Sequence, residues 1–84
     1  MTDETKRMNP TQRRALIIEA AHDIASECDG GLLALDYDTV SEWCAVPTSV
    51  GTIRRYFHTI GDLQRAVTVR NRDFHDQAVR IGLL

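Results

Sequence analysis

The chain has 84 residues, enough for one small domain with a modest hydrophobic core. Only 6% of the residues are aromatic, whereas 43% are hydrophobic overall, which favours a helical bundle. No apolar run is long enough to cross a membrane and no signal-peptide core is present, so we expect a cytoplasmic protein.

The formal net charge is −2, but the charges are separated along the sequence. Residues 1–14 contain four basic and two acidic residues, residues 15–42 contain seven acids and no Lys or Arg, and residues 43–72 contain five arginines and one acid. Nine of the ten basic residues are Arg, whose planar guanidinium suits bidentate contact with phosphate and guanine. This separation favours contact with nucleic acid at a basic end of the molecule.

A flexible polar arm is expected over residues 1–9, followed by a folded domain over residues 10–84. The first helix should begin at Pro10, with Asn9 as its N-cap, and run to about Cys28. Its apolar residues recur about every four positions, as expected of a helix with one buried face.

The first helix also carries two groups of charged residues. Arg13 and Arg14 lie in or near its first turn, where the helix dipole disfavours cations. We therefore expect an outside partner for them, such as a phosphate group, with a solvated basic surface as the alternative. Further along, Glu19, Asp23 and Glu27 form an acidic line, which is either a solvated face or a docking surface for a basic protein partner.

The start of a second helix is indicated by capping residues. The run Asp29-Gly30-Gly31 ends the first helix, because glycine can adopt the left-handed conformation. Thr39 and Glu42 then have the spacing of a capping box, so the second helix should start at Asp38 or Thr39.

The second helix must be short, because Pro47 disfavours helical geometry in the residue before it. Val40, Trp43 and Cys44 have the spacing of an inward face. Residues 45–48 are the predicted turn.

A third helix follows, with Ser49 as its N-cap and the short side chains of Gly51 and Thr52 in its first turn. Its apolar face consists of Ile53, Tyr56 and Phe57. Arg54, Arg55 and His58 project around the remaining surface. A short helix with a small, capped N-terminus and a basic flank is suited to entering a major groove.

The stretch Ser49-Val50-Gly51-Thr52-Ile53-Arg54-Arg55-Tyr56-Phe57 resembles the recognition helix of TetR-type repressors, whose pattern runs Ser-x-Gly-Thr-(Leu/Ile)-Tyr-x-(His/Tyr)-Phe. Arg54 stands where the family has its first Tyr, and Ile60 stands where the family has a Lys. The turn before the helix is longer than the family's and has no glycine. The resemblance covers roughly residues 10–70 and implies a helix-turn-helix that binds DNA. It does not imply induction by a small molecule, since we expect no room for the family's C-terminal ligand-binding domain.

Thr59 is predicted to cap a fourth helix, which starts at Ile60 and continues towards the C-terminus. The apolar residues of this segment exceed what a small core needs: Phe74, Ala78, Ile81, Leu83 and Leu84. We expect this excess to form the seam of a homodimer.

Candidate chemical sites are sparse. Cys28 and Cys44 occupy apolar positions with no ligand at metal-binding spacing, so we expect buried reduced thiols. His22 and His75 have no ligand partners either. No nucleophile–base pair and no phosphate-binding glycine loop is recognisable, so we expect no enzyme activity, no cofactor and no metal.

The sequence therefore predicts an all-α domain of four helices, the second and third forming a helix-turn-helix, that binds double-stranded DNA as a transcriptional regulator. The residues expected to contact DNA are Arg13, Arg14, Thr48, Ser49, Val50, Gly51, Thr52, Arg54, Arg55, Tyr56 and His58. Ser49 to Thr52 should approach base edges, and the arginines, Tyr56 and His58 should approach phosphates. Tyr56 is alternatively a core aromatic, and Ser49 to Thr52 an ordinary capped helix start.

Three functions fit this prediction. The first is transcriptional regulation, for which the minimal size is typical of a phage or a mobile element. The second is a helix-turn-helix-shaped inhibitor or adaptor that binds protein and does not read DNA. The third is an accessory protein of DNA packaging or recombination.

Overall fold

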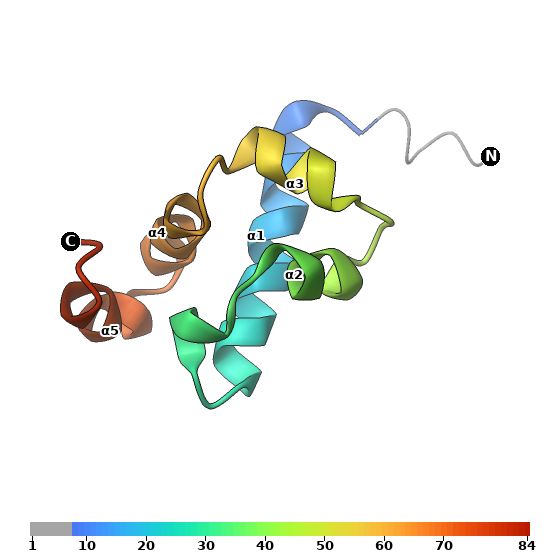
Figure 1. Cartoon of the computed structure of the whole chain (residues 1–84). Helices are drawn as coiled ribbons and strands as arrows, with labels where there is room; N and C mark the ends of the chain where they lie inside the picture. Colours follow the sequence, from blue (N-terminus) through green and yellow to red (C-terminus); the bar gives the residue numbers. More distant parts are fainter. Residues whose placement is uncertain (1–7) are drawn as a thin grey trace.

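The computed structural model describes residues 8–84, which form five α-helices and two short 3-10 helices (Figure 1). The α-helices are α1 (Pro10–Glu27), α2 (Tyr37–Trp43), α3 (Val50–Tyr56), α4 (Ile60–Arg70) and α5 (His75–Arg80). The 3-10 helices are η2 (Gly31–Ala34) and η3 (Arg72–Phe74). Residues 8–84 contain no β-strand, so the all-α prediction is confirmed. Of the arm expected over residues 1–9, residues 1–7 lie outside the described part.

Three helix starts are capped as predicted. Asn9 forms a capping box with Gln12, whose amide nitrogen donates to Asn9 Oδ1 over 2.8 Å. Ser49 Oγ accepts from the Thr52 amide over 3.1 Å, and Thr59 Oγ1 accepts at the start of α4. These side chains satisfy amide groups that have no partner within the helix.

The predicted start of α2 is wrong by one to two residues. α2 begins at Tyr37 and not at Asp38 or Thr39. Its N-cap is Asp36, whose Oδ1 accepts from the Thr39 amide over 2.7 Å. The Thr39 hydroxyl donates to Asp36 Oδ2 over 3.1 Å instead of capping a helix itself. The Asp36 carboxylate is the N-cap in place of the Thr39 hydroxyl, because a charge-assisted hydrogen bond at a helix N-terminus is stronger than a neutral one.

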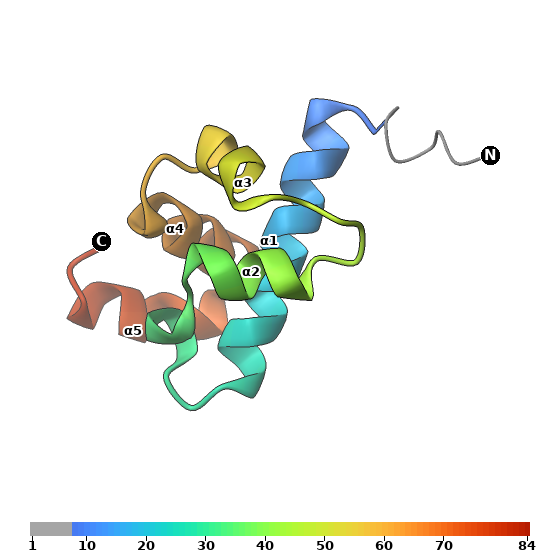
Figure 2. The same cartoon turned by 45° about the vertical axis from the view of Figure 1, so that its right-hand side comes forward.

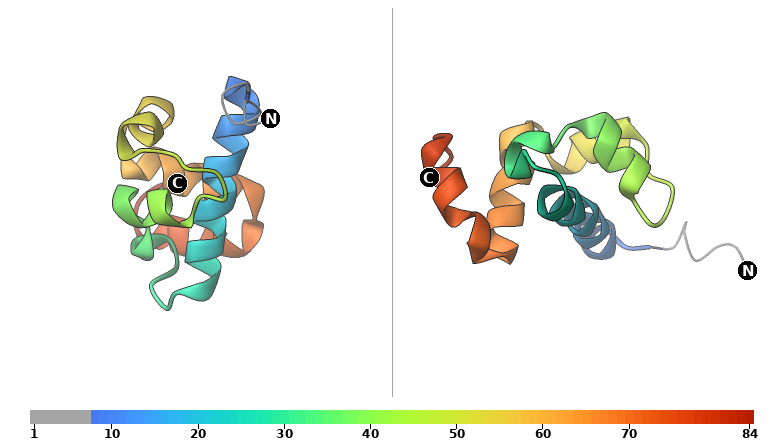
Figure 3. Two further views of the ribbon diagram at one scale, coloured as in Figure 1. Left: turned by 90° about the vertical axis from the view of Figure 1, so that its right-hand side faces the viewer. Right: turned by 90° about the horizontal axis from the view of Figure 1, so that it is seen from below.

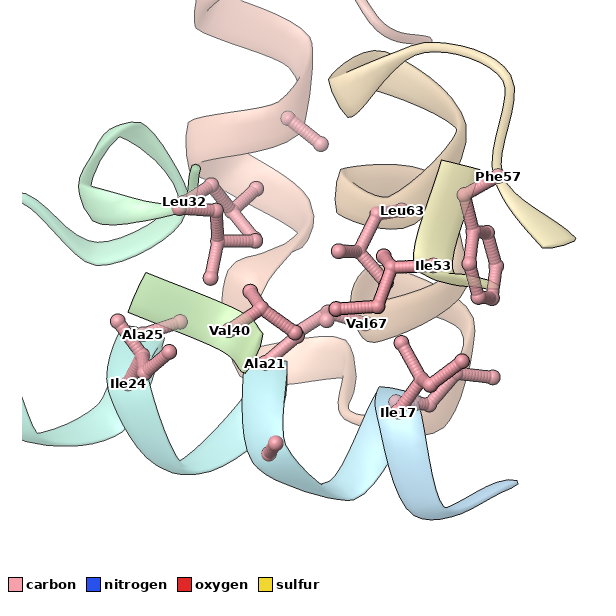
Figure 4. Packing of buried hydrophobic residues seen from close by; sticks show 14 residues of the cluster. Ile17, Ala21, Ile24, Ala25, Leu32, Val40, Ile53, Phe57, Leu63 and Val67 are labelled. Atoms are coloured by element: carbon pink, nitrogen blue, oxygen red, sulfur yellow. The ribbon is translucent and has the colours of Figure 1, made fainter. Parts of the chain in front are cut away.

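The core lies between α1 and the other helices (Figure 4). Ile17, Ala21 and Ile24 on α1 are fully buried. Figure 4 shows that they face side chains from every neighbouring element: Leu32, Val40, Ile53, Phe57, Leu63 and Val67. Ala20 and Ala21 leave room for the backbone of a neighbouring helix to come close to α1.

Trp43 does not face the core as predicted. It is the last residue of α2 and is 39% exposed. Val40, one turn earlier, is the residue of α2 that is fully buried. Trp43 lines an open groove together with Leu16, Ala20 and Ala45.

The fourth helix ends earlier than predicted, at Arg70, with Asn71 as its C-cap. The Asn71 side chain caps η3 by accepting from the Asp73 amide over 3.0 Å, and its Nδ2 lies 3.0 Å from His22 Nε2 on α1. Asn71 is thus the C-cap of α4 and the N-cap of η3 at once. The change of direction lets the C-terminal segment fold back towards η2.

The Gln77 side chain joins α5 to η2 and its N-cap by two hydrogen bonds. Its Oε1 accepts from the Leu32 amide and its Nε2 donates to the Gly30 carbonyl, each over 2.8 Å. Gly31 has a φ of 58°, and a Cβ at that position would lie 2.5 Å from Gln77 Oε1. The positive φ favours glycine at position 31, and any larger residue there would also displace the Gln77 side chain from its hydrogen bonds.

Most of the apolar residues predicted to form a dimer seam pack inside the chain instead. Ala78 is fully buried, and Phe74, Ile81 and Leu83 pack against the core. The apolar side chains of this segment that stay exposed are Val79 and Leu84. The expected continuation of the fourth helix towards the C-terminus is wrong beyond Arg70, and most of the apolar excess packs inside the chain.

The N-terminal end of α1 and the whole of α3 lie at one end of the molecule in every side view (Figures 1, 2 and 3). Seen from below, α5 lies at the opposite end from the turn that joins α2 to α3 (Figure 3, right). No helix within residues 8–84 is both long and apolar enough to cross a bilayer.

Candidate nucleic-acid interface

The first turn of α3 is accessible. Ser49 and Gly51 are exposed, and Val50 and Thr52 are half-buried. A Cβ added to Gly51 would meet only Ser49 Oγ, at 3.9 Å. The fold therefore gives no packing reason for glycine here, although glycine is unfavourable inside a helix.

Arg54 and Tyr37 connect the far end of α3 to the start of α2. The Arg54 guanidinium carbon lies 5.1 Å from the centre of the Tyr37 ring, which is the geometry of a cation–π contact. Arg55 and His58 are exposed nearby. These three basic side chains belong to α3 and the short connection to α4.

Arg13 and Arg14 of α1 contact opposite ends of α3. Arg13 Nη1 donates to Thr48 Oγ1 over 3.1 Å, immediately before α3. The Arg14 guanidinium carbon lies 5.1 Å from the centre of the Phe57 ring, immediately after α3. The structure thus brings the basic start of α1 together with α3, as the sequence predicts.

Two of the predicted contact residues are less accessible than expected. Thr48 is buried, with 7% of its surface exposed. Its hydroxyl donates to the Val46 carbonyl over 2.8 Å and accepts from Arg13. Tyr56 is half-buried and packs against the core, in line with the alternative that the sequence left open.

Burial raises the pKa of the Cys44 thiol, while a hydrogen bond with Thr48 and the charge of Arg13 act in the opposite direction. Cys44 is therefore a protonated thiol at neutral pH. Both cysteines are free and partly buried, not fully buried as predicted.

Two further arginines, Arg65 and Arg70, are paired with acidic side chains. Arg65 pairs with Asp62, Nη1 to Oδ1, at 3.0 Å, and Arg70 pairs with Glu19 across the α1–α4 contact. Two of the five arginines in the stretch 43–72 therefore have their charge balanced within the fold. One member of the acidic line is neutralised by the same pairing, since Glu19 contacts Arg70.

Sequence reasoning missed two residues at this end of the molecule. The Tyr37 hydroxyl donates to the Phe57 carbonyl over 2.9 Å, and Ser41 Oγ donates to the Thr48 carbonyl over 2.6 Å. Both contacts join α2 to α3 through backbone atoms, which have no sequence signal.

The part of the chain that the structure describes has no group of three or more His, Cys, Asp or Glu side chains that could hold a metal ion. No protein-family model matches the chain, and comparisons with curated proteins and with solved structures give no match. The resemblance to TetR-type repressors thus rests on the residue pattern of α3 and its flanks alone.

Proposed function

We propose that the protein is a small DNA-binding transcriptional regulator, in which α2 and α3 act as a helix-turn-helix and the start of α3 enters the major groove. The observation that best supports this is the open space at Gly51, in an exposed helix start capped by Ser49. A glycine that the fold does not require is expected where another molecule approaches the backbone closely. Val50 and Thr52 beside it supply a methyl surface and a hydroxyl for base edges.

The basic side chains around α3 are suited to bind the phosphates on either side of the groove. Arg54 and Arg14 each rest on an aromatic ring, Tyr37 and Phe57 respectively. Such stacking restricts the side chain before DNA binds and so lowers the entropy lost on binding. Arg55 and His58 are exposed and would add further phosphate contacts.

A single domain with so few contacts binds DNA weakly, so we propose that two copies bind a two-fold symmetric site. Val79 and Leu84 are exposed apolar side chains of the C-terminal segment that a second copy would cover.

The test is fluorescence anisotropy with a pool of random-sequence duplexes at about 50 mM salt, where non-specific affinity is strong. We expect the parent to bind, and Arg55→Ala to bind more weakly with a salt slope reduced by about 1, because one phosphate contact is lost. Arg80→Ala, on the exposed surface of α5, is the matched control and should behave like the parent.

Two results would contradict the proposal. The first is that the parent binds no duplex at low salt, which is what a protein-binding inhibitor or adaptor predicts. The second is that Arg80→Ala weakens binding as much as Arg55→Ala does, which would show that α3 is not the DNA-binding face.

A further inference from the structure

The connection between α2 and α3 is held by side chains and not by glycine. It runs from Cys44 to Ser49, between the last residue of α2 and the first residue of α3, and contains Pro47. A chain segment of this kind has many conformations available, so its geometry must be fixed by contacts from outside it.

Those contacts converge on Thr48. Ser41 on α2 donates to its carbonyl over 2.6 Å, and Arg13 on α1 donates to its hydroxyl over 3.1 Å. The Thr48 hydroxyl in turn donates to the Val46 carbonyl over 2.8 Å, within the connection itself. Arg13 Nη1 also lies 3.4 Å from the Pro47 carbonyl oxygen. We call Arg13, Ser41 and Thr48 the Thr48 cluster.

The position of the cluster determines what it can do. Thr48 directly precedes Ser49, the N-cap of α3, so fixing its carbonyl and hydroxyl fixes the first residue of the helix. α3 is only seven residues long, and its C-cap, Phe57, is buried. The cluster at the start and Phe57 at the end therefore set the direction in which α3 projects.

We infer that Arg13, Ser41 and Thr48 are positioning residues for base recognition, and that they determine the specificity of DNA binding more than its strength. The inference rests on the proposed function. Base readout needs donors and acceptors placed to within a fraction of an ångström, whereas phosphate attraction tolerates displacement. Loosening the start of α3 should therefore weaken binding to a preferred sequence and leave non-specific binding largely intact.

This assigns Arg13 a role different from the phosphate contact that its sequence position suggests. One nitrogen, Nη1, reaches both Thr48 Oγ1 and the Pro47 carbonyl. Lysine should not replace Arg13, because its ammonium lies one bond nearer the backbone than Nη1 and falls short of these acceptors. Thr48→Ser should preserve the role of Thr48, because serine keeps the hydroxyl. Thr48→Val should not, because valine has nearly the same volume but no hydroxyl.

The experiment compares two affinities for each variant, one for a duplex enriched by selection from a random pool and one for the unselected pool. We expect Thr48→Val, Ser41→Ala and Arg13→Lys to lower the ratio of these affinities at least about tenfold without changing the salt slope. Thr48→Ser should retain the parent's ratio. Gln77→Ala, which removes two hydrogen bonds at the other end of the molecule, controls for a general loss of stability and should leave the ratio unchanged.

Hydrogen exchange of the amides in residues 45–52 gives a second measurement that does not depend on DNA. Exchange there should accelerate in Thr48→Val and not in Arg55→Ala. An unchanged affinity ratio in Thr48→Val, or a salt slope lowered by about 1 in Arg13→Gln, which removes the charge, would overturn the inference. If the parent binds no duplex while exchange accelerates in Thr48→Val, the proposed function fails and with it the role in specificity, but the cluster still fixes α3.

Discussion

The Tyr37 hydroxyl donates a 2.9 Å hydrogen bond to the carbonyl oxygen of Phe57, joining the first residue of α2 to the C-cap of α3. A carbonyl at the end of a helix has no partner within that helix, so the bond satisfies a group that would otherwise need water. The ring of Tyr37 also lies beneath the guanidinium of Arg54. Tyr37 thus supports α3 through its hydroxyl and orients a proposed phosphate contact through its ring.

Tyr37→Phe should separate these two roles. We expect the free energy of unfolding to fall by about 1 kcal/mol, because one partly buried hydrogen bond is lost. Affinity for duplex DNA should stay close to the parent's, because the ring under Arg54 remains. Urea denaturation and anisotropy measure the two quantities. A stability loss with Tyr37→Leu but none with Tyr37→Phe would mean that the hydroxyl contributes nothing.

Gly51→Ala should raise stability and weaken DNA binding at the same time. Alanine is a better helix former and its Cβ would enter open space, so we expect a gain of about 0.5–1 kcal/mol in the free energy of unfolding. The same methyl group would stand between the backbone of α3 and the DNA.

Gly61→Ala is the matched control for that substitution. Gly61 is also the second residue of its helix, and an added Cβ would make ordinary contacts of 3.6 Å with Leu83 and Thr59. We expect a similar gain in stability with unchanged DNA affinity. Equal affinity in Gly51→Ala and the parent would show that nothing approaches the start of α3 closely.

Gln77→Leu should be among the more destabilising single changes outside the hydrophobic core. It leaves the Leu32 amide and the Gly30 carbonyl without their partners, which we expect to cost about 1–3 kcal/mol. Gln77→Glu keeps the acceptor for Leu32 but sets a carboxylate against the Gly30 carbonyl, so it should fall between the parent and Gln77→Leu. If both variants unfold at the parent's urea midpoint, α5 is not held by this side chain.

Cys44 should resist alkylation in the folded protein. Burial raises the pKa of its thiol, so the reactive thiolate is rarer than in an unfolded chain at the same pH. In a Cys28→Ser background, iodoacetamide at about pH 8 should react much more slowly without urea than with it. Comparable rates in the two conditions would contradict the burial of this group.

The same pKa shift predicts how stability depends on pH. As the pH rises through the ordinary thiol range, the unfolded chain loses its proton before the folded chain does. The free energy of unfolding should therefore decrease as the pH rises above about 8. Cys44→Ala in the Cys28→Ser background should remove that component of the decrease, as followed by urea denaturation at several pH values.

The helix starts could be predicted because capping is local. Asn9, Ser49 and Thr59 each bind an amide only three residues further along the chain. The error at α2 has the same local origin, since Asp36 and Thr39 are both acceptable caps and the carboxylate is the stronger acceptor. The end of α4 could not be predicted from periodicity, because Asn71 is held partly by His22 on α1.

Long-range polar contacts account for the rest of what the sequence did not predict. Arg13 and Thr48 are 35 positions apart, and each alone is typical of an exposed surface residue. Gln77 and Leu32 are 45 positions apart, and a glutamine in a polar helix face gives no sign of such a contact. The apolar pattern predicts which residues are buried, but it contains no information on which polar side chain will meet which backbone group.

The Thr48 cluster has a consequence for protein engineering. Arg13, which holds the start of α3, belongs to α1 and lies outside any segment that spans only α2 and α3. A peptide cut to those two helices, or a graft of them onto another scaffold, would lose the orientation of the helix that it was meant to transfer. The smallest transferable unit of this protein therefore begins at Asn9 and not at Asp36.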